Sequence, residues 1–333
     1  MILKLITQGL YFALTLILGL SIKLLFTEKI EPNLKNEESE LTYFTNSDKK
    51  KKMKFTSMLD EKNKSKPSDD KNIFVSIVIP AYNEEDRIKV CLDEILDYFD
   101  KNPSKNYEII ICNDGSKDNT SKIVLEDYVD KYGTNKNGFR LLELAKNRGK
   151  GGAVRKGVLA SRGRYILFCD ADGATKFEDL DKLLKKMESL EESGSKKCVV
   201  VGSRAHLEKE SMAERSFLRT ILMHGFHFFV KYIGNVRSIK DTQCGFKLFT
   251  RDSAQFLFSN LHIERWAFDV ELLFLCEKYG ISTGEIPVRW QEIDGSKLTP
   301  LTAALQMARD LIVLRLYYIF GVYQVKGDIK NKL

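Results

Sequence analysis

Residues 164–177, RYILFCDADGATKF, decide which fold is expected for this chain. The apolar run Tyr165–Cys169 is typical of a strand that is buried on both faces, as in a parallel sheet. Asp170 and Asp172 follow at positions i and i+2, which places both carboxylates on the same side of the chain. Two carboxylates this close repel each other unless a cation lies between them. The local alternative is an Asp-Gly turn that simply ends the strand, so the flanking sequence has to decide.

Three further strand–helix units precede this stretch. Apolar runs predict strands within 74–80, 107–116 and 139–144. Amphipathic segments at 85–99 and 117–132, and a further helical segment at 151–162, lie between the strands. This alternation predicts an α/β fold: a doubly wound, mainly parallel sheet with helices on both faces. Ligands of such sheets bind beyond the carboxyl ends of the strands.

Polar loops follow all four strands, where such a ligand would bind. The loops are PAYNEE (80–85), NDGS (113–116), NRGKGGAV (147–154) and the segment 170–172. Gly149, Gly151 and Gly152 let the backbone approach a phosphate, and the N-terminus of the next helix adds positive potential. The loop is neither G-x-x-x-x-G-K-[ST] nor G-x-G-x-x-G, which argues against P-loop ATPase chemistry and a dinucleotide site. Together the loops predict a nucleotide site that handles a diphosphate.

The composition excludes some classes of protein. The 333 residues carry a net charge of +7, which is no nucleic-acid signature, and six cysteines without a C-x-x-C pair predict neither disulfides nor a zinc site.

The segments at the two ends of the chain suggest a membrane setting. Residues 1–26 contain an uncharged run that predicts a retained membrane anchor, with a cleaved signal peptide as the alternative. Residues 27–72 are lysine-rich and are expected to be a disordered linker. An amphipathic helix is expected within 301–333, lying at a membrane interface or covering the sheet.

The ordered motifs resemble those of a known family. IVIPAYNEE (77–85), ICNDGSKDNT (111–120), NRGKGGAVRKG (147–157) and LFCDADGAT (167–175) are similar to motifs of GT-A glycosyltransferases of family 2. The blocks KDTQCGFKLF (240–249), RWAFDVELL (265–273) and EIPVRWQEIDGSKL (285–298) narrow the resemblance to the polyprenyl-phosphate glucosyltransferases of that family. The resemblance implies a GT-A glycosyltransferase domain at 73–300.

The resemblance also implies an activity. Glucose would pass from UDP-glucose to dolichyl phosphate, giving dolichyl β-D-glucosyl phosphate and UDP by a metal-dependent, inverting displacement, with Mg²⁺ or Mn²⁺ as cofactor. The product would be the glucose donor for N-glycan precursor assembly. The implied partners are UDP-glucose, dolichyl phosphate and membrane lipid. The implied location is the endoplasmic reticulum membrane, crossed once, with the catalytic domain in the cytoplasm.

Residue roles follow from the same match. Asp170 and Asp172 would bind the metal, and Asp114 would accept a hydrogen bond from the uracil imide, which suits an acceptor-only carboxylate. Uridine and its ribose would lie against Pro80, Ala81, Tyr82 and Glu84. The other donor-binding residues implied are Gly115, Ser116, Lys150, Ala171 and Gln243, the last of them shaping the sugar pocket.

The acceptor phosphate needs cations more than it needs a base. A phosphate monoester is about 90% dianion at neutral pH, so a general base is hardly required. The candidate cations are Arg204, Lys247, Lys297, Arg215 and Arg219. Asp241, Asp269 and Glu271 are expected to orient these cations or the sugar hydroxyls, and ordinary helix charges are the alternative for the last two. The implied catalytic set is Asp170, Asp172, Asp269, Lys247 and Arg204.

Two other functions stay open at this point. The nucleotide motifs do not separate a glucosyltransferase from a polyprenyl-phosphate mannosyltransferase or another sugar transferase. A non-catalytic membrane scaffold that binds a nucleotide-sugar is a third hypothesis. The apolar segment 214–233, rich in phenylalanine and arginine, is expected to meet a membrane surface.

Overall fold

The computed structural model describes Thr15, Gly19 and residues 38–48, 52–59, 73–134, 138–207, 229–293 and 300–325. The predicted anchor at 1–26 therefore lies outside the described residues except for Thr15 and Gly19. Most of the segment 214–233 also lies outside them, and so do three of the candidate cations, Arg215, Arg219 and Lys297.

Within the described residues, a nine-stranded sheet forms the centre of the fold, in the order β2-β1-β5-β4-β3-β6-β8-β7-β9. Its parallel part consists of β3 (Val75–Ala81), β4 (Tyr107–Asn113), β5 (Phe139–Glu143) and β6 (Tyr165–Cys169). The predicted α/β fold with a mainly parallel sheet is confirmed.

On the other side of β6, the strand β8 runs opposite to both of its neighbours. β8 (Phe246–Thr250) is antiparallel to β6 and to β7 (Cys198–Ser203), whereas β9 (Ser282–Pro287) is parallel to β7. Because β8 is antiparallel to β6, its first residue, Phe246, pairs with Cys169 at the carboxyl end of β6. The loop that leads into β8 is thereby brought to the edge formed by the carboxyl ends of the parallel strands. This edge, where ligands of such sheets bind, is called the ligand edge below.

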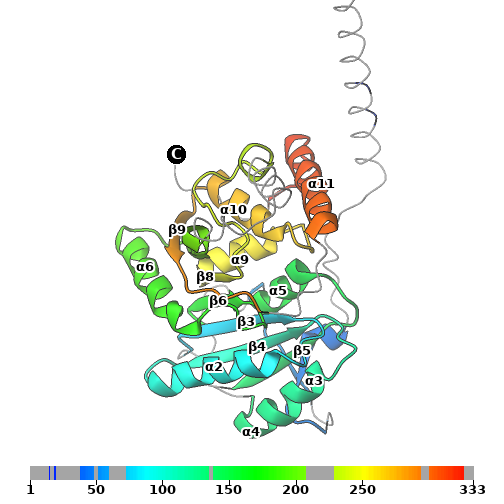
Figure 1. The fold of residues 1–333 in the computed structure, drawn as a ribbon, viewed down its shortest axis with the longest axis vertical. Coiled ribbons are helices and arrows are strands. Elements are labelled where there is room, and N and C mark those ends of the chain that lie inside the picture. The colour runs from blue at the N-terminus through cyan, green and yellow to red at the C-terminus, as the bar shows by residue number, and fades with distance from the viewer. Residues whose placement is uncertain are drawn as a thin grey trace, which may run out of the picture.

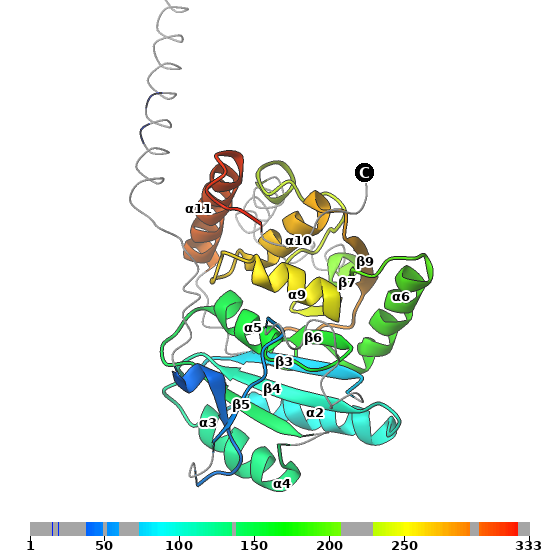
Figure 2. The same cartoon turned by 180° about the vertical axis from the view of Figure 1, so that it is seen from behind.

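Helices cover both faces of the sheet, as the two opposite views show (Figure 1, Figure 2). Residues of a strand point alternately to the two faces, so Val75, Ile77 and Ile79 lie in one buried cluster and Val78 in another. The first cluster contains residues of α2 (Ile88–Lys101), the π-helical η3 (Val124–Val129) and α6 (Leu180–Glu192). The second contains residues of α5 (Lys150–Leu159), α9 (Arg251–Ser259), α10 (Phe268–Lys278) and α11 (Pro300–Ile319). The short helical elements are α3 (Thr120–Ile123), α4 (Asp130–Tyr132), η4 (Phe177–Asp179) and η5 (Phe229–Ile233).

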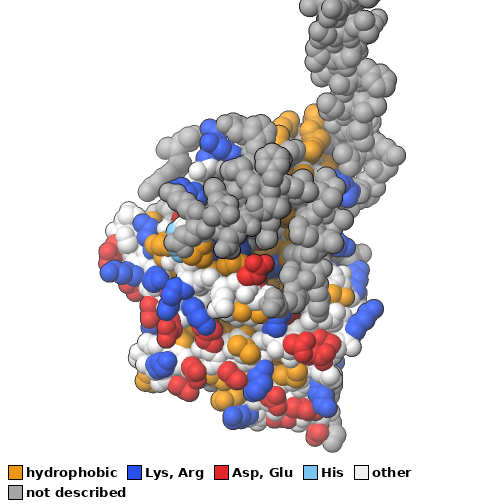
Figure 3. All heavy atoms as spheres, viewed as in Figure 1, with side chains coloured by type: hydrophobic (Ala, Val, Ile, Leu, Met, Phe, Trp, Pro, Cys, Tyr) orange, Lys and Arg blue, Asp and Glu red, His pale blue; other side chains and the backbone are white. Residues whose placement is uncertain are grey.

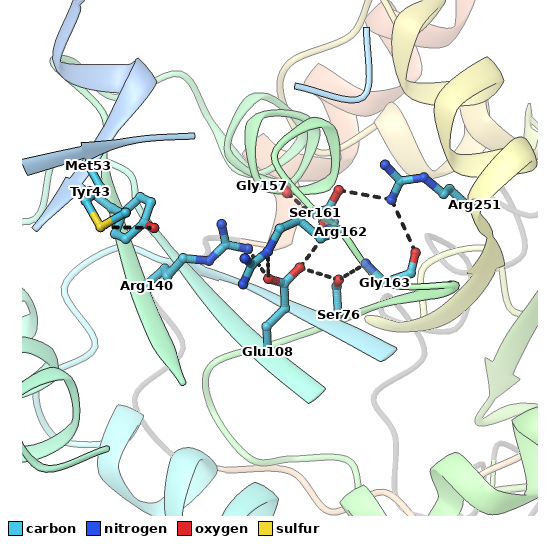
Figure 4. A network of polar contacts seen from close by, with 10 residues as sticks. All are labelled: Tyr43, Met53, Ser76, Glu108, Arg140, Gly157, Ser161, Arg162, Gly163 and Arg251. Atoms are coloured by element: carbon cyan, nitrogen blue, oxygen red, sulfur yellow. Dashed lines mark hydrogen bonds and ion pairs between the residues drawn. The ribbon is translucent and has the colours of Figure 1, made fainter. Parts of the chain in front are cut away.

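A buried ionic network connects neighbouring strands of the sheet near their amino ends (Figure 4). Glu108 in β4 is fully buried and is bonded by Ser76 Oγ at 2.6 Å, by Arg162 Nε at 2.8 Å and by Arg140. Burial raises the pKa of Glu108, but the two guanidinium groups and the hydroxyl lower it further, so the pKa lies below its ordinary value. This network lies at the edge opposite the ligand edge and is structural.

Part of the segment predicted to be a disordered linker is folded. Residues 38–48 and 52–59 form the 3-10 turn η1 (Glu38–Leu41) and the strands β1 (Thr42–Phe44) and β2 (Lys52–Lys54). β1 pairs antiparallel with β5 through Tyr43 and Leu142, and Tyr43, Phe55 and Met58 are buried in the core. Figure 2 shows this part of the chain in blue along the β5 edge of the sheet. The expected disorder therefore does not hold for these residues, because three large apolar side chains find partners across the sheet edge.

The helices that the structure describes do not support the predicted location in the endoplasmic reticulum membrane. The longest of them, α11, has 20 residues, and Arg309, Asp310 and Arg315 interrupt its apolar sequence. None of the described helices is both long and apolar enough to cross a membrane. This finding contradicts the prediction of a single-pass protein of the endoplasmic reticulum membrane, and that prediction is not retained.

Candidate active site

The carboxyl end of β6 carries Asp170 and Asp172. Lys150, the first residue of α5, contacts Asp170, with 2.6 Å between Nζ and Oδ1. Burial lowers the pKa of Lys150, but the carboxylates of Asp170 and Asp269 raise it above its ordinary value. Burial and the neighbouring Asp170 together raise the pKa of Asp172. The repulsion between Asp170 and Asp172 thus favours the binding of a further cation at this edge of the sheet.

The loop before β8 touches the same carboxylate. Gly245 accepts a hydrogen bond from the backbone N–H of Asp170 at 3.1 Å. A Cβ atom at position 245 would collide with the Asp170 carboxyl group, lying 2.7 Å from Oδ1 and closer still to Oδ2. The glycine therefore leaves the space in which the Asp170 carboxylate is held.

We expect Gly245→Ala to lower turnover about 100-fold, because displacing a reacting group by about 1 Å costs that much. The Asp170 carboxylate cannot share its position with a methyl group, and its contact with Lys150 should be lost with it. Initial rates of the sugar transfer that the sequence resemblance implies, with the melting temperature as a check on folding, measure the effect. Gly284→Ala in β9 is the matched control, since its Cβ meets only the flexible Lys186 side chain. Equal rates for wild type and Gly245→Ala would show that the carboxylate position is unimportant.

A buried ion pair lies behind this site. Lys247 in β8 contacts Asp269 in α10, and its Nζ also donates to the carbonyl of Cys244 at 2.8 Å. The Lys247 side chain has no exposed surface. Burial raises the pKa of Asp269, although Lys247 and Lys150 lower it in part. Asp269 is therefore in contact with Lys247 of β8 and also feels the charge of Lys150 of α5.

Arg204 lies just after β7 and is held in one orientation. Its Nε and Nη2 donate to Asp241 at 2.8 and 2.9 Å, and its backbone N–H donates to the same carboxylate at 2.8 Å. The guanidinium lies over the Trp290 ring, 5.4 Å from the centroid. Burial lowers the pKa of Arg204, but Asp241 and, to a smaller extent, Asp170 raise it well above its ordinary range. About a third of the side chain, 31%, is exposed, so this cation is oriented and accessible.

The ends of β3 and β4 form a second part of the site. Asp114 is buried, and its two carboxylate oxygens accept from the backbone N–H groups of Arg148 at 2.6 Å and Gly149 at 2.9 Å. Burial raises the pKa of Asp114 to about 6, although those two bonds lower it in part. The loop after β3 joins this one, because Ser116 Oγ accepts from the backbone N–H of Asn83 at 2.9 Å. Tyr82 is exposed beside it.

Three of the expected residues have other partners. Glu84 is paired with Arg87 at 2.7 Å, one turn along the chain. Gln243 Nε2 donates to the sulfur of Met307 in α11 at 2.9 Å. Glu271 is fully buried and accepts from the backbone N–H groups of His262 and Ile263 at 2.9 and 2.7 Å. Glu271 therefore orders the loop before α10 and does not orient Arg204 or Lys247.

Other residues around the site did not follow from the motifs. Trp266 lies beside Lys150, with Nζ 5.9 Å from its ring centroid, and Trp290 lies beneath Arg204. The Arg148 side chain is buried and paired with Glu40 of the N-terminal segment. A signal for the two tryptophans existed, since both belong to the blocks that narrow the resemblance. No signal pointed to Glu40, because its partner lies 108 residues away.

The carboxylate pair fits a hard divalent cation. Mg²⁺ is commonly held by one or two carboxylates together with substrate phosphates, and carboxylates also suit Mn²⁺. In the part of the chain that the structure describes, no group of three or more His, Cys, Asp or Glu residues could hold a metal ion. All six cysteines are buried and free. Asp170 and Asp172 thus supply a partial ligand set, which substrate oxygens and water would have to complete.

Comparison with known proteins identifies the class to which this fold and site belong. Residues 76–257 match the family described as glycosyl transferase family 2, so the chain belongs to that family. A crystal structure of glucosyl-3-phosphoglycerate synthase from Mycobacterium tuberculosis, in complex with Mn²⁺, UDP-glucose and phosphoglyceric acid, is similar with a TM-score of 0.50. The similarity covers 75% of this chain and 81% of the other at 17% identity, and it supports the GT-A-like fold alone.

Relatives within the family are much more similar in sequence. Dolichyl-phosphate beta-glucosyltransferase of Homo sapiens is 51% identical over 77% of this chain and 79% of its own length. The Drosophila melanogaster protein of the same name is 47% identical over 95% and 94%. That of Saccharomyces cerevisiae is 44% identical over 79% and 80%. The resemblance to polyprenyl-phosphate glucosyltransferases is confirmed, and the chain is a glycosyltransferase.

Proposed function

We propose that this chain transfers glucose from UDP-glucose to dolichyl phosphate, giving dolichyl β-D-glucosyl phosphate and UDP. The observation that carries the proposal is 44–51% identity, over 77–95% of the chain, to relatives named for that activity. The site supports it chemically, because carboxylates, an oriented guanidinium and a glycine-rich loop meet at the ligand edge of the sheet.

The donor is proposed to lie across the carboxyl ends of β3, β4 and β6. Asp114 would accept the uracil imide N–H, and Pro80, Ala81, Tyr82 and Glu84 would line the uridine. Each Asp114 oxygen already accepts one backbone N–H and can accept another hydrogen bond when ionised. Its pKa of about 6 leaves the carboxyl mostly ionised at neutral pH. Gly115, Ser116 and Ala171 belong to the same loops and would supply backbone contacts.

Asp170 and Asp172 are the residues that would hold Mg²⁺ or Mn²⁺. When bound there, the cation supplies charge neutralisation for the donor diphosphate and for the departing UDP. Lys150 contacts Asp170 from the N-terminus of α5 and adds a fixed positive charge on the same side.

The acceptor phosphate is proposed to be the nucleophile, attacking the anomeric carbon in line with the departing UDP and inverting its configuration. Its second pKa of about 6 makes it a dianion at neutral pH, so this chain need not abstract a proton. The chain instead has to bring two anionic substrates together, which requires cations in fixed positions.

Arg204 is the proposed contact to the acceptor phosphate. It is accessible, it is oriented by Asp241 and Trp290, and a guanidinium matches phosphate geometry. Lys247 is fully enclosed with Asp269, so we assign it a positioning role behind Lys150 and the carboxylate pair. Gln243 would shape the sugar pocket from the loop that contains Gly245.

A lipid acceptor also requires an apolar approach. Ile319 at the C-terminal end of α11 and Phe320 and Val322 just after it are exposed, while Leu311, Leu314 and Tyr317 of α11 are buried against the domain. Hydrophobic side chains are visible at the upper end of α11 in Figure 3, whereas acidic and basic side chains are interspersed lower on that face. We propose that this end of α11 meets the polyprenyl chain or surrounding lipid.

Donor selectivity tests the proposed function. The purified chain is incubated in detergent with dolichyl phosphate and either UDP-glucose or GDP-mannose, and the sugar-lipid is quantified. The proposal predicts turnover with UDP-glucose and about 100-fold less with GDP-mannose, because guanine is larger than uracil and would have to displace the backbone groups that hold Asp114. Turnover with GDP-mannose alone would support sugar transfer to dolichyl phosphate but would contradict UDP-glucose as the donor. No lipid product from either donor would favour the scaffold hypothesis.

A further inference from the structure

The N-terminal segment 38–59 contacts the loop that holds Asp114. Glu40 is buried, and its two carboxylate oxygens accept from Arg148 Nε and Nη2, both at 2.9 Å. Lys156 of α5 donates to the same carboxylate at 3.0 Å. Burial raises the pKa of Glu40, but the hydrogen bonds from Arg148 and Lys156 lower it further, so the pKa lies below its ordinary value. Glu40 therefore stays ionised and joins the loop at 147–149 to the helix that follows it.

Arg148 has two roles at once. Its side chain is bound by Glu40, while its backbone N–H donates to Asp114 Oδ1 at 2.6 Å. Asn147 Nδ2 donates to the backbone carbonyl of Asp114 at 3.0 Å, and Gly149 N–H donates to Oδ2 at 2.9 Å. A change in the position of the Arg148 side chain thus moves the backbone groups that hold the Asp114 carboxylate.

The loop has little room to adjust by itself. Gly149 has a positive φ of 83°, and a Cβ atom there would lie 2.7 Å from the carbonyl oxygen of Glu264. Gly152 N–H donates to that same carbonyl at 2.9 Å, so the loop is packed against the segment before α10. The Glu264 carboxylate also lies 4.0 Å from Arg148 Nη1, whereas Glu40 accepts two hydrogen bonds from Arg148 at 2.9 Å, so Glu40 is the closer of the two carboxylates that hold the Arg148 side chain.

We infer that Glu40 is a positioning residue for the nucleotide donor: it holds Arg148 so that the backbone N–H groups of 148 and 149 present the Asp114 carboxylate to the base. The inference rests on the proposed function in that Asp114 is taken to contact uracil. It adds a role for a segment whose composition predicted only a linker.

The segment 38–59, which carries Glu40, is anchored independently of the loop at 147–149. Met58 N–H donates to the carbonyl of Leu159 at 2.8 Å, and Gln255 Nε2 donates to the carbonyl of Met58 at 2.8 Å. Tyr43 and Phe55 lie against the Arg140 guanidinium, 5.4 and 5.1 Å from its central carbon, and Figure 4 shows Tyr43 and Arg140 near each other. The segment should therefore stay docked when Glu40 is changed, which allows its local effect to be measured.

The test compares Glu40→Gln with Met58→Ala in the full chain. Met58 is buried in the same segment, and its backbone is bonded to Leu159 and Gln255, so its truncation is the control for general destabilisation. Hydrogen–deuterium exchange of the free enzyme reports on the amides of Arg148 and Gly149, UDP titration gives the nucleotide affinity, and steady-state rates give kcat and KM for UDP-glucose.

For Glu40→Gln we expect exchange at 148 and 149, Kd for UDP and KM for UDP-glucose each to rise about tenfold, with kcat within about twofold of wild type. A charge-assisted hydrogen bond is worth a factor of this size. Met58→Ala should lower the melting temperature without changing any of these. Glu40→Asp keeps the charge but has a shorter side chain, so it should show the same pattern more weakly. It replaces Glu40→Gln in the test if Glu40→Gln does not fold.

Two outcomes would overturn the inference. The first is unchanged exchange and UDP affinity in Glu40→Gln, and the second is an equal change in Met58→Ala, which would make Glu40 merely structural. Exchange and UDP binding do not depend on turnover. A wild type that binds UDP but makes no glucosyl lipid would therefore count against the proposed function and leave this inference to be judged separately.

Discussion

Asp172→Asn is expected to lower glucose transfer about 1,000-fold while the protein stays folded. Loss of a ligand to a divalent cation removes several kcal/mol of charge stabilisation, and each 1.4 kcal/mol, approximately, is a factor of ten in rate. The fold should persist because the oxygen of the Asn side chain can still accept the hydrogen bond that Asp172 Oδ1 takes from Ala174 N–H. Removing one of two neighbouring carboxylates also relieves repulsion, so the melting temperature should be equal to that of wild type or higher.

The measurement is the initial rate of lipid glucosylation at saturating Mg²⁺, together with the melting temperature. Asp97→Asn, an equivalent change on the exposed face of α2, is the control and should leave both quantities unchanged. Full activity in Asp172→Asn would remove the metal-binding role from this residue.

Lys247→Met is expected to cause the largest loss of stability, about 3–5 kcal/mol, because it leaves Asp269 buried without its closest cation. The melting temperature should fall by about 5–10 °C. A second substitution, Asp269→Leu, made in the Lys247→Met background, should recover most of the loss, since an apolar pair replaces an isolated buried charge. Thermal and denaturant unfolding measure all three forms.

An exposed lysine gives the matched comparison for this prediction. Lys101 of α2 lies 3.9 Å from Glu178 with 70% of its side chain exposed, so Lys101→Met should change stability by less than about 1 kcal/mol. If Lys247→Met and Lys101→Met were equally stable, the buried pair would contribute nothing to the free energy of unfolding. The positioning role that we propose for Lys247 would then be wrong.

The parallel half of the fold could be predicted because its strands are continuous apolar runs that alternate with helices. The direction of β8 could not, since FKLFT pairs equally well in either direction and only packing decides. That direction has consequences for the site, because it brings Gly245 and Lys247 to the carboxyl end of β6. The spacing of residues within each motif carries no information on such pairings between distant strands.

The same limit applies to the candidate site. Polar residues at strand ends pointed to Asp114, Asp170 and Asp172, and the structure places the last two together with Lys150. Their partners come from elsewhere in the chain, as with Glu40 and Arg148. A short strand such as Thr42–Phe44, set in a lysine-rich stretch, carries too few apolar residues to be distinguished from a linker. Its order depends on a sheet edge that forms from residues far along the chain.

The most direct test is transfer from radiolabelled UDP-glucose to dolichyl phosphate in detergent, with Mg²⁺, with EDTA, and with Mg²⁺ restored after EDTA. We expect a labelled glucosyl lipid that disappears on chelation and returns with the metal. Lipid product that persists in EDTA would contradict the role given to Asp170 and Asp172. The absence of any labelled lipid, under conditions in which the protein is folded and binds UDP, would contradict the proposed reaction itself.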